Sequence, residues 1–134
     1  MQYLLDTNVC IEYLRRRNAL LIRRIHARLT TDVCLCSVVK AELIGGALRS
    51  RRPTVDRAKL DAFVRPYLSL PFNDDAAEVF ARIRFHLESL GMTIGPYDLE
   101  IASIALHHGL TLVTHNVAEF GRVPGLAVED WEVP

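Results

Sequence analysis

The sequence predicts an α/β fold, a three-layer α/β/α sandwich with a central, mostly parallel sheet. Short β-branched or aliphatic runs alternate with longer segments of helical periodicity, which is the pattern of repeated βαβ units. Right-handed crossovers in such units make the strands parallel. The chain has 134 residues, 50% of them hydrophobic, and contains no linker or internal repeat, so residues 1–134 are expected to form a single domain.

The first strand–helix unit lies at the N-terminus. Residues 2–5, Gln2-Tyr3-Leu4-Leu5, are predicted to form a short strand. Asp6, Thr7 and Asn8 follow, and each is a residue type that favours the N-cap of a helix. A helix is therefore expected over residues 9–14.

The second unit repeats this order. Apolar residues at helical spacing predict a helix over residues 19–29, followed by a strand over residues 33–36. Ser37 is expected to cap the next helix, over residues 38–48. Glu42 lies about one turn inside that helix.

In the middle of the chain, a further helix is expected to end near Arg65, because a proline follows. Residues 68–72 predict a third strand. Asn73 or Asp74 then caps a strongly amphipathic helix that ends before Gly91.

The C-terminal part contains the last units. Pro96 is tolerated in a first turn, so a helix is expected from there to Gly109. Residues 110–113 predict a strand, residues 114–120 a turn with a short helix, and residues 127–129 an edge strand.

The charge is distributed unevenly between the two halves of the chain. Residues 1–67 contain 13 Lys or Arg and 6 Asp or Glu, whereas residues 68–134 contain 3 and 10. A basic surface beside an acidic site would suit a polyanion such as RNA, although the same charges can simply be solvated helix faces. Candidate contacts to an RNA backbone are Arg15, Arg16, Arg17, Arg23, Arg49, Arg51 and Arg52.

Composition and motifs exclude several classes of protein. There is no apolar run long enough to span a membrane and no export signal, so a cytoplasmic protein is expected. Cys10, Cys34 and Cys36 lack a zinc-binding pattern and are interpreted as buried reduced thiols. No GxSxG, P-loop or GxGxxG motif is present, which disfavours a serine hydrolase and a nucleotide-cofactor enzyme.

Four acidic residues, Asp6, Glu42, Asp98 and Glu119, each follow an aliphatic run and lie near the start of a helical stretch. Parallel strands end at one edge of a sheet, so these side chains can converge there. Two carboxylates about 4 Å apart repel by roughly 4 kcal/mol at an effective dielectric constant near 20. A cluster of this kind favours a hard cation, Mg²⁺ or Mn²⁺, over zinc.

Three of the four acids also have a structural interpretation. Asp6 can cap a helix, and Asp98 can favour a helix dipole from the first turn. Asn116 and Glu119 have the spacing of a capping box. Glu42 has no such explanation, since it lies among apolar neighbours where an unpaired carboxylate is unfavourable.

Taken together, several segments resemble the PIN-domain nucleases, and specifically the VapC-type toxins. The resemblance rests on Leu4-Leu5-Asp6-Thr7-Asn8, Ser37 through Glu42, Gly95-Pro96-Tyr97-Asp98, Thr114-His115-Asn116-Val117-Ala118-Glu119-Phe120 and the ending Glu129-Asp130-Trp131. It covers nearly the whole chain, and the ending is similar to that of the branch that cleaves tRNA.

The resemblance implies an endoribonuclease with Asp6, Glu42 and Asp98 as metal ligands. Many family members have a fourth acid where this chain has Asn116, and Glu119, one turn further, could replace it. Supporting hydrogen bonds are implied for Thr7, Asn8 and Thr114. The resemblance also implies a VapB-type antitoxin, commonly a toxin homodimer, and tRNA as the substrate.

The expected reaction is attack on a phosphodiester by a water molecule that the metal ion activates, which leaves 5′-phosphate and 3′-hydroxyl ends. A non-catalytic module that binds a cation or a partner through the acidic pocket remains an alternative. Phosphotransfer through an aspartyl intermediate is disfavoured, because Asp6-Thr7-Asn8 lacks the second Asp of a DxDxT motif.

Overall fold

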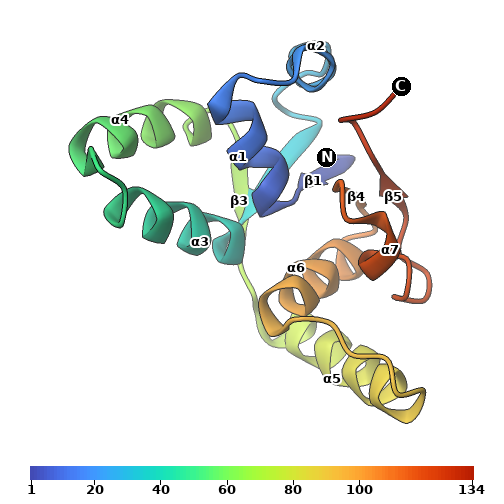
Figure 1. Cartoon of the computed structure of the whole chain (residues 1–134). Helices are drawn as coiled ribbons and strands as arrows, with labels where there is room; N and C mark the ends of the chain where they lie inside the picture. Colours follow the sequence, from blue (N-terminus) through green and yellow to red (C-terminus); the bar gives the residue numbers. More distant parts are fainter.

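The structure, a computed structural model, describes residues 1–134 and contains one five-stranded sheet with helices packed around it (Figure 1). The strands are β1 (Tyr3–Leu5), β2 (Val33–Cys36), β3 (Leu68–Leu70), β4 (Thr111–Val113) and β5 (Val128–Glu129). The helices are α1 (Thr7–Arg15), α2 (Ala19–His26), α3 (Ser37–Leu48), α4 (Pro53–Val64), α5 (Asp74–Ser89), α6 (Pro96–His107) and α7 (Val117–Phe120).

The sheet has the strand order β3-β2-β1-β4-β5, and all four strand pairs are parallel. β1 lies in the centre, where Tyr3 pairs with Val33 on one side and with Thr111 on the other. Leu4 and Leu5 have no exposed surface. The predicted fold class, a three-layer α/β/α sandwich with a parallel sheet, is confirmed.

The helices are arranged so that the carboxyl ends of the central strands face α1, α3 and α6. α3 packs against α4 and α5 packs against α6, and α3 also contacts both α1 and α6 (Figure 1). A cluster of 33 buried hydrophobic residues forms the core. Cys10, Cys34 and Cys36 belong to it as free, buried thiols, as predicted.

The element boundaries differ from the predicted ones for identifiable reasons. α2 ends at His26 and not at residue 29, because Leu29 is 70% exposed and contributes nothing to the buried face. β3 ends at Leu70, since Pro71 has no backbone N–H with which to continue the ladder. The expected cap by Ser37 is wrong: Cys36 is the N-cap residue and makes no side-chain capping bond.

Other local predictions are confirmed by the hydrogen bonds. Asn73 caps α5 by accepting the backbone N–H of Ala76 at 2.9 Å. Gly91, just beyond the end of α5, has a φ of 68°, a conformation that favours glycine. No helix of the chain has both the length and the hydropathy needed to cross a membrane.

Candidate metal site at the carboxyl ends of the central strands

Asp6 stands at the end of β1, between the sheet and the first turn of α1. It is the N-cap residue of α1, and its Oδ1 accepts the backbone N–H of Thr7 at 2.8 Å. Its Oδ2 accepts the hydroxyl of Thr114 at 2.8 Å. Thr114 follows β4, the parallel neighbour of β1, so the sheet itself brings these two residues together.

Burial and hydrogen bonding act on Asp6 in opposite directions. The side chain is 3% exposed, and this burial raises the pKa of its carboxyl group above the ordinary value. The hydrogen bonds from Thr114 and Thr7 oppose that increase, whereas the charges of Glu42 and Glu119 add to it. Asp6 therefore caps a helix, as one interpretation held, and also lies in an acidic cluster.

Glu42 reaches the same place from α3. Its Oε1 accepts the hydroxyl of Thr7 at 2.7 Å. Thr7 therefore donates its backbone N–H to one carboxylate and its hydroxyl to another, which fixes Asp6 and Glu42 relative to each other. Glu42 is half-buried and not fully enclosed among its apolar neighbours.

Asp98 lies in the first turn of α6, and its carboxyl group is half-buried. Burial first, and then the charges of Asp6, Glu119 and Glu42, raise its pKa to about 6. Because the charges of Asp6, Glu119 and Glu42 all act on Asp98, acids separated by up to 113 positions in the chain lie in one electrostatic environment. The fold thus brings Asp6, Glu42 and Asp98 near one another, and their role as metal ligands stays a prediction.

Glu119 and Asn116 complete the cluster, but they do not form a capping box. The N-cap Asn116 makes no capping bond. Its side-chain Nδ2 donates to Glu119 Oε2 at 2.8 Å, and its backbone N–H donates to the hydroxyl of Thr114 at 3.0 Å. Glu119 Oε1 accepts the backbone N–H of Gly95 at 3.3 Å, and so ties α7 to the start of α6. Asn8 is exposed and makes no side-chain hydrogen bond, which departs from the support expected of it.

The cluster lacks a basic partner from the protein. None of the ion pairs within 4.0 Å involves Asp6, Glu42, Asp98 or Glu119. Carboxylates that repel one another without a Lys, Arg or His counter-ion either take up protons or bind a cation. The all-oxygen donor set, with the Asn116 amide beside it, fits a hard divalent ion. No three of these acids have ligand atoms within 4.8 Å of one another, so the side chains would have to close around an ion.

His115, Asp130 and Glu132 form a second group of possible metal ligands, which the sequence did not predict. Ligand atoms of His115, Asp130 and Glu132 all lie within 4.8 Å of one another. His115 Nδ1 and Asp130 Oδ2 are 2.9 Å apart, and the buried Glu132 Oε2 has no hydrogen-bond partner. Only the pairing of β5 with β4 brings residues 115 and 130 together, and no local spacing signals that contact.

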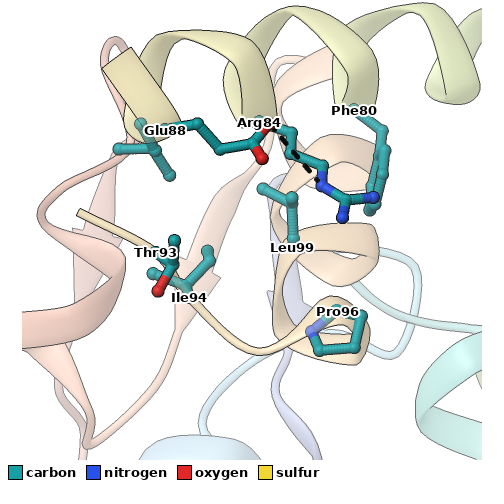
Figure 2. A pocket seen from close by; sticks show the side chains of 8 residues that line it. Phe80, Arg84, Glu88, Thr93, Ile94, Pro96 and Leu99 are labelled. Carbon is teal, nitrogen blue, oxygen red and sulfur yellow. Dashed lines mark ion pairs between the residues drawn. The ribbon is translucent and has the colours of Figure 1, made fainter. Parts of the chain in front are cut away.

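A small hollow lies between α5 and α6, and an ion pair between Arg84 and Glu88 lies at it (Figure 2). Phe80 and Leu87 of α5 face Ile94, Pro96 and Leu99 across it. The hollow measures about 160 Å³ and contains none of the clustered acids. It marks where the segment before α6 packs on α5.

The chain is similar to known proteins over nearly its whole length. Residues 3–126 match the sequence model of the PIN domain family. The chain is 35% identical over 131 residues to a Salmonella typhimurium protein named tRNA(fMet)-specific endonuclease VapC, with 98% of each chain covered. It is 32% identical over 133 residues to ribonuclease VapC2 of Rickettsia felis, covering 98% of this chain and 99% of that one.

Solved structures give the same result. A crystal structure of DNA-bound VapBC from Salmonella typhimurium superposes with a TM-score of 0.93 at 35% identity, covering 98% of both chains. VapBC2 from Rickettsia felis, bound to a promoter DNA fragment, gives a TM-score of 0.91 at 33% identity, covering 98% of this chain and 99% of that chain.

Proposed function

Since this chain belongs to the PIN domain family and its relatives are VapC ribonucleases, we propose that it is the toxin of a toxin–antitoxin module and acts as a metal-dependent endoribonuclease on tRNA. The observation that carries the proposal is the convergence of Asp6, Glu42 and Asp98 without any basic counter-ion. The name of the Salmonella relative supports tRNA as the substrate class.

We assign Asp6, Glu42 and Asp98 as the residues that would hold Mg²⁺ or Mn²⁺, with Glu119 and Asn116 at the edge of the site. The chemistry that such an ion supplies is Lewis acidity, which stabilises charge on a phosphodiester and makes water more acidic. Thr7 and Thr114 donate hydrogen bonds to Asp6 and Glu42, and so fix the positions of these carboxylates relative to each other. Water attacks phosphorus, and the bond from phosphorus to the 3′-oxygen breaks.

The proposal predicts RNA cleavage that requires a divalent cation. Purified protein incubated with total tRNA and Mg²⁺ is expected to give fragments with 5′-phosphate and 3′-hydroxyl ends, and EDTA is expected to stop the reaction. Asp6→Ala should lower the cleavage rate at least about a hundredfold, since it removes a ligand for an ion whose stabilisation is several kcal/mol. The ends are identified by phosphatase sensitivity and by ligation.

Cleavage that survives both EDTA and Asp6→Ala would contradict the assignment, and cyclic phosphate ends would contradict attack by water. A protein that binds divalent cations but leaves tRNA intact would instead support the non-catalytic alternative.

The pKa of Asp98 predicts how metal binding depends on pH. The carboxyl group must lose its proton to bind a cation, and its pKa is raised to about 6. The dissociation constant for Mn²⁺ is therefore expected to be nearly constant above pH 7 and to rise at least about tenfold for each unit below pH 6, because the proton on Asp98 competes with the ion and the raised pKa of Asp6 acts in the same direction. Calorimetry at pH 5 and pH 7.5 measures this. An affinity that is equal at the two values would contradict the role of Asp98.

We further propose that residues 1–134 act as one domain in the cytoplasm, that a VapB-type antitoxin binds the chain, and that the toxin forms a homodimer. The solved VapBC complexes of Salmonella typhimurium and Rickettsia felis support the antitoxin partner. Sedimentation of the toxin alone and with its antitoxin tests both associations.

A further inference from the structure

A cleft of about 550 Å³ opens beside the acidic cluster, between α1, α3 and the first turn of α6. Thr7 and Glu42 belong to both the cluster and the lining of the cleft. Arg49 is the only basic residue of the lining, and Tyr97 is its only aromatic residue. A molecule bound at the acidic cluster would therefore extend into this cleft.

Two glycines inside α3 shape the floor of the cleft. Gly45 and Gly46 have no positive φ, so backbone conformation does not require glycine at either position. Glycine inside a helix is unfavourable relative to alanine. A Cβ at Gly45 would lie 3.1 Å from Nη1 of Arg49, while one at Gly46 would meet no atom within 4 Å. The missing side chains leave room for the Arg49 guanidinium to lie along the helix and keep the cleft open above Gly46.

Tyr97 and Arg49 present unused binding groups to this space. The Tyr97 side chain is 60% exposed and lies between Pro96 and Asp98. Arg49 is exposed and forms no ion pair within 4.0 Å. An exposed aromatic ring together with a free cation is the combination with which proteins bind single-stranded nucleic acid, through base stacking and phosphate contact.

We propose that this cleft binds the unpaired nucleotide next to the scissile phosphate, with its base stacked on Tyr97 and its phosphate held by Arg49. The inference rests on the proposed ribonuclease function and adds the residues that select an unpaired segment of the substrate. RNA is favoured over a protein segment because the cleft is continuous with the acidic cluster and contains a ring and a cation suited to a nucleotide. Glu100, also on the lining, faces the same space and weakens the attraction for phosphate.

The test measures tRNA binding separately from cleavage. All proteins carry Asp98→Asn, so that they bind tRNA without cutting it. Each of the substitutions Tyr97→Ala, Tyr97→Phe, Arg49→Gln and Gly45→Ala is added to this parent, and the dissociation constant for total tRNA is measured by filter binding. Tyr97→Ala is expected to weaken binding about tenfold, since stacking of one base has that magnitude, whereas Tyr97→Phe should bind within about twofold of its parent. Arg49→Gln should weaken binding and reduce the salt slope by about one.

Gly45→Ala is expected to displace Arg49 and weaken binding in the same direction, without lowering Tm. Matched controls come from α5, where Phe85 is 76% exposed and Arg82 is 79% exposed, and neither residue lines the cleft. Phe85→Ala and Arg82→Gln should leave the dissociation constant within about twofold of the parent, because neither residue borders the cleft. In proteins with Asp98 intact, Tyr97→Ala should raise KM about tenfold with little change in kcat.

Wild-type affinity for tRNA in both Tyr97→Ala and Arg49→Gln would overturn the proposal. If these variants also showed weaker self-association in sedimentation, the cleft would be a protein contact and not a nucleotide-binding site. A wild-type protein that binds tRNA without cutting it would refute the ribonuclease function alone, and the binding series would still decide the role of the cleft.

Discussion

Replacing Asp98 by Asn is expected to abolish RNA cleavage and, in the same protein, to raise the Tm of the metal-free chain. The substitution removes a proposed metal ligand, so the cleavage rate should fall at least about a hundredfold. It also removes a charge that is unfavourable in the absence of the ion, because burial and the charges of Asp6, Glu119 and Glu42 raise the pKa of Asp98 from 3.8 to about 6.

The stability gain should depend on pH in a defined direction. A carboxyl group whose pKa is higher in the folded state than in the unfolded state destabilises the fold above the folded pKa, and this effect disappears as the pH falls to the unfolded pKa. The two values are about 6 and 3.8 for Asp98. The advantage of Asp98→Asn should therefore be full above pH 6 and fade toward pH 3.8. The full shift corresponds to about 3 kcal/mol, and partial solvent exposure reduces the expected gain to about 1 kcal/mol.

Asp75→Asn is a matched control, because Asp75 also lies in the first turn of a helix and is 77% exposed. It should retain cleavage and should not raise the Tm. If Asp98 served only the helix dipole, Asp98→Asn would lower the Tm as Asp75→Asn does, and cleavage would persist. Thermal unfolding with EDTA at pH 7.5 and at pH 4.5, together with the tRNA assay, distinguishes these outcomes.

Trp131→Ala should cause the largest loss of stability of any change discussed here. Trp131 is 3% exposed although it lies beyond the residues that match the PIN domain. Its ring centroid lies 4.9 Å from that of Tyr3. The Arg28 guanidinium lies over both rings, with its Cζ 5.4 Å from the centroid of Trp131 and 4.7 Å from that of Tyr3. Its Nε1 donates to Glu129 Oε1 at 3.1 Å. Removing such a ring from a packed site costs about 3–5 kcal/mol.

The C-terminal segment forms hydrogen bonds with the α2 region and with the residue that follows β4. Asn18 and Arg24 of the α2 region donate to the backbone carbonyls of Glu132 and Val133, at 3.0 and 2.8 Å. The backbone N–H of Thr114 donates to the carbonyl of Glu129 at 2.9 Å. Loss of Trp131 is therefore expected to loosen the residue that positions Asp6, and to lower cleavage as well as stability.

Urea unfolding measures the effect of Trp131→Ala, with Val133→Ala as the control, since Val133 is 42% exposed. The control should change the free energy of unfolding by less than about 0.5 kcal/mol. A loss below about 1 kcal/mol in Trp131→Ala would show that the C-terminal segment is not part of the core.

Much of the fold follows from local rules. The cap at Asn73 and the strand before Asp6 depend on neighbouring residues alone, and both could be read from the sequence. The end of α2 could not, because periodicity does not reveal that Leu29 faces solvent. The expected capping box failed because the Asn116 side chain donates to the side chain of Glu119, three positions further along the chain, and makes no capping bond with a backbone N–H.

The site was predictable to the extent that the strand ends determine it. Asp6 and Thr114 follow neighbouring parallel strands, and a parallel sheet necessarily places them together. The group of His115, Asp130 and Glu132 depends on the path of the C-terminal segment, which no spacing rule gives. The cleft beside Tyr97 likewise depends on how α3 and α6 meet.

The most direct test of the account is a calorimetric titration of the metal-free protein with Mn²⁺ at pH 7.5. The account predicts saturable binding that weakens at least about tenfold in Asp98→Asn, because one charged ligand is lost, and that is unchanged in Asp75→Asn. It also predicts that His115→Ala leaves this binding unchanged. Saturable binding that survives Asp98→Asn but disappears in His115→Ala would place the ion at the other cluster, and would contradict the claim that the four converging acids form the metal site.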